Sequence, residues 1–157
     1  MGPALEGTLV IDLTSEFYAS LGGALLGDFG ANVIRIEDTS NPRHVEFNRD
    51  GMHPPERWDS LRELCQRNKR SIELDLSNPE GRKVFEQLIA RADVFLTDLP
   101  FPEAERQALR YEDLSALKPD LIYTRGSGFG PHGPDRDLPA LDEIAAEFDQ
   151  VEILHFR

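Results

Sequence analysis

The sequence predicts an α/β fold built on a doubly wound, mostly parallel sheet. Short runs rich in β-branched residues alternate with helical segments along the chain, which is the pattern of repeated strand–helix–strand units. The first such unit covers about thirty residues, a length that suits a right-handed crossover between parallel strands. At 157 residues the chain fits a single domain, 1–157, and can bury a substantial core.

Five segments are expected to form the strands. Each is short, mostly apolar and rich in β-branched or aromatic residues. In chain order the expected strands are Thr8–Leu13, Ala31–Glu37, Ser71–Leu76, Asp93–Thr97 and Leu121–Thr124. The continuous apolar run of the first one indicates a strand that is buried on both faces, as in a parallel sheet.

Helical segments lie between these strands and after the last one. In chain order they are Tyr18–Phe29, Trp58–Gln66, Pro79–Arg91, one or two short helices within Glu103–Leu117, and Leu141–Phe148. Thr14 or Ser15 is expected to cap the first helix, and Gly30 to end it. Pro79 opens the third helix, because proline is tolerated in the first helical turn.

Ligands of doubly wound, Rossmann-like sheets bind beyond the carboxyl ends of the strands. The segments expected around that edge are Thr14–Phe17, Asp38–Asn41, Asp98–Phe101 and Gly126–Gly130. The connection 38–58 is longer than most loops of compact domains, which favours a functional or a mobile segment. The stretch Gly126–Pro139 is expected to be a loop whose glycines let the backbone approach a ligand closely.

Composition excludes several classes of partner. Acidic residues outnumber basic residues 29 to 17, and the net charge of −12 disfavours nucleic acid and anionic membranes. No apolar run approaches the length of a membrane span, and the N-terminus lacks the features of a signal peptide. Cys65 is the only cysteine, so we expect a buried core residue in a protein of the reducing cytoplasm. The four histidines show no metal-ligand spacing, and no metal site is expected.

The densest positive cluster consists of Arg67, Lys69 and Arg70, directly before the third strand. Phosphate groups need such charges, and arginine can pair with them in a bidentate manner. The alternative is a solvated strand entrance that protects the edge of the sheet. The pattern G-x-G-x-x-G is missing from the first strand–helix turn, which argues against a nicotinamide-linked oxidoreductase.

Taken in order, several motifs resemble the N-terminal part of family III CoA-transferases. The matching stretches are Asp12–Thr14, Gly30–Glu37, Asn68–Ile72, Pro79–Gly81, Ala92–Val94, Pro119–Tyr123 and Ser127–Gly130. The resemblance extends over residues 5–146, nearly the whole chain. It implies transfer of coenzyme A (CoA) between an acyl-CoA and a carboxylic acid, with acyl-CoA as a substrate and no permanently bound cofactor.

The resemblance also implies roles for individual residues. Arg106 matches an arginine that contacts CoA in some relatives. The expected CoA-binding residues are Arg67, Lys69, Arg70 and Arg106 for the phosphates, and Gly128 and Gly130 near the acyl group. In the family an aspartate is the covalent nucleophile. Its position is expected beyond Arg157, so no residue of this chain is assigned a catalytic role.

In the family, C-terminal segments and a second subunit complete the fold. The chain is therefore expected to be an incomplete version that acts weakly by itself and associates as a homodimer or with a second chain. Phe17, Asp38 and Asp98 depart from the family pattern, and Asp38 stands where some members have a basic residue, so it would repel a phosphate. The alternative function is a non-catalytic module of the same fold that binds CoA or another protein.

Overall fold

The computed structural model describes residues 2–44, 60–138 and 150–154. Six strands form one sheet in the order β3-β2-β1-β4-β5-β6. They are β1 (Leu9–Leu13), β2 (Asn32–Asp38), β3 (Lys69–Leu74), β4 (Val94–Thr97), β5 (Ile122–Ser127) and β6 (Gln150–Leu154). The first five strands are parallel, and β6 runs antiparallel to β5. This order is that of a doubly wound Rossmann sheet, which confirms the predicted fold class.

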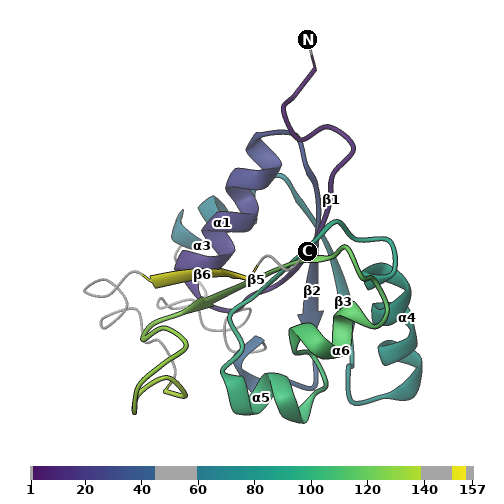
Figure 1. Cartoon of the computed structure of the whole chain (residues 1–157). Helices are drawn as coiled ribbons and strands as arrows, with labels where there is room; N and C mark the ends of the chain where they lie inside the picture. The colour runs from purple at the N-terminus through teal and green to yellow at the C-terminus, as the bar shows by residue number, and fades with distance from the viewer. Residues whose placement is uncertain (1, 45–59, 139–149, 155–157) are drawn as a thin grey trace.

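Helices cover both faces of the sheet. They are α1 (Phe17–Asp28), α3 (Ser60–Gln66), α4 (Pro79–Ile89), α5 (Phe101–Arg106) and α6 (Tyr111–Ser115). Figure 1 shows α1 and α3 on one side of the sheet and α4 and α6 on the other. The expected helix Leu141–Phe148 and residues 45–58 of the expected long connection lie outside the described residues.

The bounds of β3 and β5 differ most from the prediction. β3 begins at Lys69 rather than Ser71, because Lys69 pairs in register with Val33 of β2. β5 continues through Ser127, where a loop was expected, because its last residues pair with β6. The sequence analysis did not predict β6. Consequently Lys69 and Arg70 are strand residues, and they lie at the amino end of β3.

The core is divided by the pleat of the central strand. Ile11 and Leu13 of β1 belong to the larger buried cluster, which also contains Phe85 of α4 and Phe95 of β4. The rings of Phe85 and Phe95 meet edge to face, with centroids 5.9 Å apart, a favourable geometry for aromatic pairs. Val10 belongs to a smaller cluster that includes Leu26 of α1. Since side chains alternate along a strand, Asp12 lies on the same face as Val10, beneath α1.

Candidate functional site

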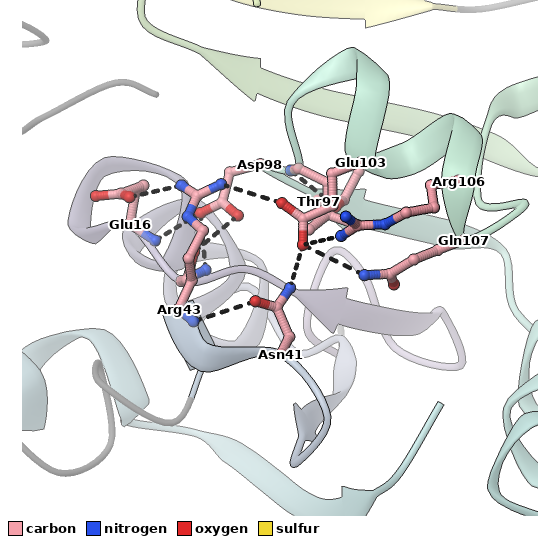
Figure 2. Close-up of polar contacts among 10 residues, drawn as sticks. Glu16, Asn41, Arg43, Thr97, Asp98, Glu103, Arg106 and Gln107 are labelled. Atoms are coloured by element: carbon pink, nitrogen blue, oxygen red, sulfur yellow. Dashed lines mark hydrogen bonds and ion pairs between the residues drawn. The ribbon is translucent and has the colours of Figure 1, made fainter. Parts of the chain in front are cut away.

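The carboxyl ends of β1 and β4 lie side by side at the centre of the sheet, where the strand order changes direction. Ligands of doubly wound sheets bind at this switch point. A group of polar residues surrounds it, and we call this group the carboxyl-edge rim. Its members are Ser15, Glu16, Asn41, Arg43, Asp98, Glu103, Arg106 and Gln107. In Figure 2 the side chains of the members other than Ser15 converge from the start of α1, the segment after β2, the end of β4, and α5 with the residue after it.

Asp98 directly follows β4 and caps α1 from eighty residues away. Its carboxylate accepts hydrogen bonds from the backbone N–H of Ser15 at 2.7 Å and of Glu16 at 2.5 Å, and from the Ser15 hydroxyl at 3.2 Å. The helix itself begins without a side-chain cap of its own, so the expectation that Thr14 or Ser15 caps it was wrong. Thr14 instead donates its hydroxyl to Asp12 at 2.6 Å. The amides of the two residues that lead into α1 are thus satisfied by a distant carboxylate.

Burial has a strong effect on this carboxyl group. Asp98 is 4% exposed, and desolvation raises its pKa from 3.8 to about 6. The hydrogen bonds from Glu16 and Ser15 and the charge of Arg43 oppose this rise in pKa. Because removal from water disfavours the charged form more than these contacts favour it, Asp98 changes its charge near pH 6.

Arg43 is the cation at the centre of the rim, and the sequence analysis did not single it out. Its Nη2 lies 2.7 Å from Oε1 of Glu16, and its Nη1 lies 3.9 Å from Oε2 of Glu103. Oε1 of Glu103 also accepts a hydrogen bond from Asn41 at 2.6 Å and one from Gln107 at 3.3 Å. Only the packing of the segment after β2 against α5 reveals this role, since one arginine in a polar stretch carries no local signal.

His44 follows Arg43 and is buried with 1% of its surface exposed. Among the residues that the structure describes, neither of its ring nitrogens has a hydrogen-bond partner. Burial lowers the pKa of His44 to about 3, and the nearby charges of Arg35 and Arg43 lower it further in the same direction. The ring is therefore neutral at physiological pH and is held beside two guanidinium groups.

A small pocket adjoins the rim at the carboxyl ends of β4 and β5. Its lining includes residues 98–101 and 126–128, together with Tyr18 of α1 and the arginines 125 and 136. The guanidinium carbon of Arg125 lies 3.1 Å from the ring centroid of Phe101, a stacking contact. Gly128 therefore lies at the carboxyl edge, as predicted, and Gly130 follows it, with its N–H donating to the Ser127 hydroxyl at 3.1 Å.

Lys69 is not a surface cation. Its side chain is 1% exposed, and its ammonium group donates to Asp12 at 2.6 Å, to the Ser20 carbonyl at 2.6 Å and to the Ser20 hydroxyl at 3.0 Å. An ammonium group has three donors, so all of them are used. Gly23 of α1 is required here, because a Cβ at this position would lie 2.4 Å from Oδ2 of Asp12.

Arg67 and Arg70 lie at the amino edge of the sheet, opposite the rim. Arg67 pairs with Asp28 at the end of α1 at 2.5 Å, and Arg70 donates to Asn32 at the start of β2 at 2.8 Å. The register places β3 beside residues 33–38 of β2, so about 16 Å of strand separates the two edges. The structure does not bring Arg67 and Arg70 together with Arg106, and their binding of CoA stays a prediction.

The comparisons with known proteins agree with this geometry. The sequence model of CoA-transferase family III matches residues 5–149. The chain belongs to CoA-transferase family III. The predicted resemblance is therefore confirmed. In this family III chain the carboxyl-edge rim lies at the switch point of the sheet.

Two relatives and one solved structure illustrate the similarity. The chain is 39% identical over 142 residues to the beta subunit of succinyl-CoA–L-malate CoA-transferase from Chloroflexus aurantiacus, covering 90% of this chain and 34% of the relative. It is 35% identical to acetyl-CoA:oxalate CoA-transferase from Acetobacter aceti, covering 91% of this chain and 36% of the relative. A CAIB/BAIF family protein from Brucella suis superposes with a TM-score of 0.76 at 30% identity, covering 92% of this chain and 38% of that one. The family III chain thus spans about a third of the length of these proteins.

Within residues 2–44, 60–138 and 150–154, no cluster of three or more histidine, cysteine, aspartate or glutamate side chains could hold a metal ion. In the same part of the chain, no helix has the length and apolar character needed to cross a membrane.

Proposed function

We propose that this chain contributes the acyl-CoA side of a CoA-transferase site, in which CoA passes between an acyl-CoA and a carboxylic acid. The observation that carries the proposal is the family match over residues 5–149, combined with a polar rim at the switch point where doubly wound sheets bind ligands. Because the chain covers about a third of its relatives' length, we propose that further polypeptide completes the site.

We assign no described residue the role of the nucleophile. Asp12 is bonded to Lys69 and Thr14, and Asp98 is bonded to the amides of α1. Asp38 is buried and accepts hydrogen bonds from Ser40 and Leu76. Each of these carboxylates has a structural partner, which supports a nucleophile that comes from outside the described residues.

The proposed contacts with CoA divide between two parts of the carboxyl edge. Arg106 is 75% exposed and lies 3.9 Å from Glu103, so its guanidinium can turn toward a phosphate at little cost. Gly128 and Gly130 lie near the adjoining pocket and are proposed to approach the acyl group. Arg67 and Arg70 could hold CoA only at the opposite edge. Replacing one of them is therefore the matched control for replacing Arg106.

Calorimetric titration of the purified chain with CoA and acetyl-CoA at low salt tests the proposal. We expect micromolar binding that weakens at least tenfold in Arg106→Ala and is unchanged in Arg70→Ala. The reverse pattern would move the CoA site to the amino edge. No heat of binding from a folded sample would overturn the proposal.

A non-catalytic module that binds another protein is the second candidate. It is favoured by the charge of the rim, where the carboxylates Glu16, Asp98 and Glu103 outnumber the guanidiniums of Arg43 and Arg106. An excess of carboxylates opposes a phosphate-rich ligand. If the folded chain binds CoA neither at pH 5.5 nor at pH 7.5, this second candidate is favoured.

The assembly and the location are also proposals. Leu25 of α1 is 45% exposed, Phe29 directly after α1 is 59% exposed, and Leu64 of α3 is 44% exposed. Apolar side chains on adjoining helices favour association, so we propose a homodimer or a complex with a second chain. Light scattering of the purified chain would reveal either state. The single cysteine, Cys65, is buried and free, which supports a protein of the reducing cytoplasm.

A further inference from the structure

The start of α1 is a ready position for an anion. The N–H groups of Ser15 and Glu16 lie directly before the 12-residue helix α1, which begins at Phe17, and the positive end of the helix dipole reinforces them. In this structure the position is already filled by the Asp98 carboxylate, at 2.7 and 2.5 Å from the two nitrogens. The occupant is part of the chain itself and is almost completely buried.

Arg43, the cation at the centre of the rim, is engaged in the same way. Arg43 bonds Glu16 at 2.7 Å and faces Glu103 at 3.9 Å. Glu103 also takes the amide donors of Asn41 and Gln107. Three carboxylates of the chain thus use the donors that an external phosphate or carboxylate would need.

We propose that Asp98 is an internal plug of this anion position, and that Glu16 and Glu103 reinforce it by holding Arg43. An external anion therefore reaches the rim only by displacing a carboxylate of the chain. The inference concerns the rim to which we assign CoA binding, and it adds a rule for which ligands enter. At neutral pH the charge of Asp98 weakens the binding of phosphate groups at the rim, and the rim binds them more tightly when that charge is removed.

The groups around Asp98 support a pH dependence of anion binding at the rim. The charged or titratable groups around it are Glu16 before α1, Tyr18 on α1, Arg43 after β2, Glu103 on α5, Arg125 on β5 and Arg136 in the following loop. Burial raises the pKa of Asp98 to about 6, so the plug becomes neutral just below that pH. His44, beside Arg43, stays neutral there because its pKa is lowered to about 3.

Inorganic pyrophosphate is the probe, titrated calorimetrically at pH 5.5 and 7.5. We expect the wild-type chain to bind it at least fivefold more tightly at pH 5.5. Asp98→Asn removes the charge and keeps an acceptor for the α1 amides, whereas Asp98→Gly also opens space. Both variants should bind pyrophosphate at least tenfold more tightly than the wild type at pH 7.5.

Asp75 provides a matched control. Its carboxylate accepts the backbone N–H of Ser77 at 2.9 Å, the Ser77 hydroxyl at 2.6 Å and the Asn78 N–H at 3.2 Å. The bonding pattern copies that of Asp98, but Asp75 is exposed and lies in the turn before α4. Asp75→Asn should leave pyrophosphate affinity unchanged at both pH values.

A second set of variants tests whether the additional pyrophosphate binds at the rim. In the Asp98→Asn background, Arg43→Ala should abolish the gain and Arg70→Ala should not. Unchanged affinity in folded Asp98→Asn, or a gain that depends on Arg70, would overturn the plug. If Asp98→Gly does not fold, Asp98→Asn and the wild-type pH series still decide the question. Because the probe is not CoA, a gain of pyrophosphate binding with no CoA binding would refute the proposed function and leave the plug intact.

Discussion

The basic run 67–70 and the carboxyl-edge rim lie at opposite ends of the sheet, and they use charge in opposite ways. In the basic run, Arg67 and Arg70 are bonded near the surface to Asp28 and Asn32, whereas Lys69 points inward to Asp12. In the rim, cations and acids from four separate segments meet around Arg43. Neighbouring charges in the sequence therefore serve separate purposes, while the coherent polar group is assembled from distant residues.

Asp75 and Asp98 make the same comparison at the level of single carboxylates. Both accept two backbone N–H groups and a serine hydroxyl. The hydrogen bond from Ser77 lowers the pKa of the exposed Asp75, whereas burial raises the pKa of Asp98 to about 6. Desolvation, and not the number of hydrogen bonds, decides the direction of the shift at the rim.

Replacing Lys69 should have the largest effect on stability. Lys69→Ala leaves Asp12 buried without its cation, and breaking a buried pair in this way costs about 3–5 kcal/mol. Arg70→Ala, on the same strand, removes an exposed side chain and should cost far less. Urea unfolding of the two variants measures the difference, and similar losses would contradict a buried structural role for Lys69.

A double variant sharpens this test. Lys69→Met with Asp12→Asn removes both charges and keeps an acceptor for the Thr14 hydroxyl. Since the double variant buries no unpaired charge, it should be more stable than Lys69→Ala alone. Losses that simply add would show that the two residues do not form an energetically coupled pair.

The pH dependence of stability should separate Asp98 from His44. The folded-state pKa of Asp98 is raised from 3.8 to about 6, so its contribution favours folding below pH 4 and is lost as the pH rises through 6. The folded-state pKa of His44 is lowered from 6.5 to about 3, so its contribution is present above pH 6.5 and is lost as the pH falls. Between pH 4 and 6 the two contributions oppose each other.

Replacing either Asp98 or His44 should reveal the contribution of the other residue to the pH dependence of stability. In Asp98→Asn, unfolding free energy should rise with pH between 4 and 6 relative to the wild type, by up to about 1.4 kcal/mol per pH unit. In His44→Phe the relative slope should have the opposite sign. Urea unfolding at several pH values measures both slopes, and Asp75→Asn serves as the control. Parallel curves for Asp98→Asn and the wild type would show that Asp98 titrates at an ordinary pH.

The sequence predicted the sheet because each parallel strand is a local apolar run, as in Thr8–Leu13 and Asp93–Thr97. It also placed four strand-end segments at one edge, three of which contribute residues to the rim, because the carboxyl ends of parallel strands meet there. It could not show that Lys69 points inward, since that depends on the register of β3 against β2 and on the space left by Gly23. It could not find Arg43 or the capping role of Asp98 either, because their partners are distant in the chain.

Arg43→Ala should have an intermediate effect. The Arg43 side chain is 23% exposed and bonds a carboxylate, and hydrogen bonds to charged groups contribute about 1.5–3 kcal/mol. Its loss also leaves Glu16 without the cation that it pairs with at 2.7 Å. Arg106→Ala is the matched control on the same rim, because a long, exposed contact contributes at most about 1 kcal/mol. Equal losses in urea unfolding would contradict the central position of Arg43.

Arg67→Ala should have the smallest effect on stability. The Arg67–Asp28 pair is bidentate, with Nε and Nη2 both bonded to the carboxylate, and this bond lowers the pKa of Asp28. Because the pair lies at the surface, salt should screen it, and the Debye length falls to about 3 Å at 1 M. The loss of stability should therefore be smaller than that of Arg43→Ala at low salt and should vanish at 1 M NaCl. A loss that persists at high salt would mean that Arg67 stabilises the amino edge by packing, and the contrast between exposed and buried charge would then rest on Lys69 alone.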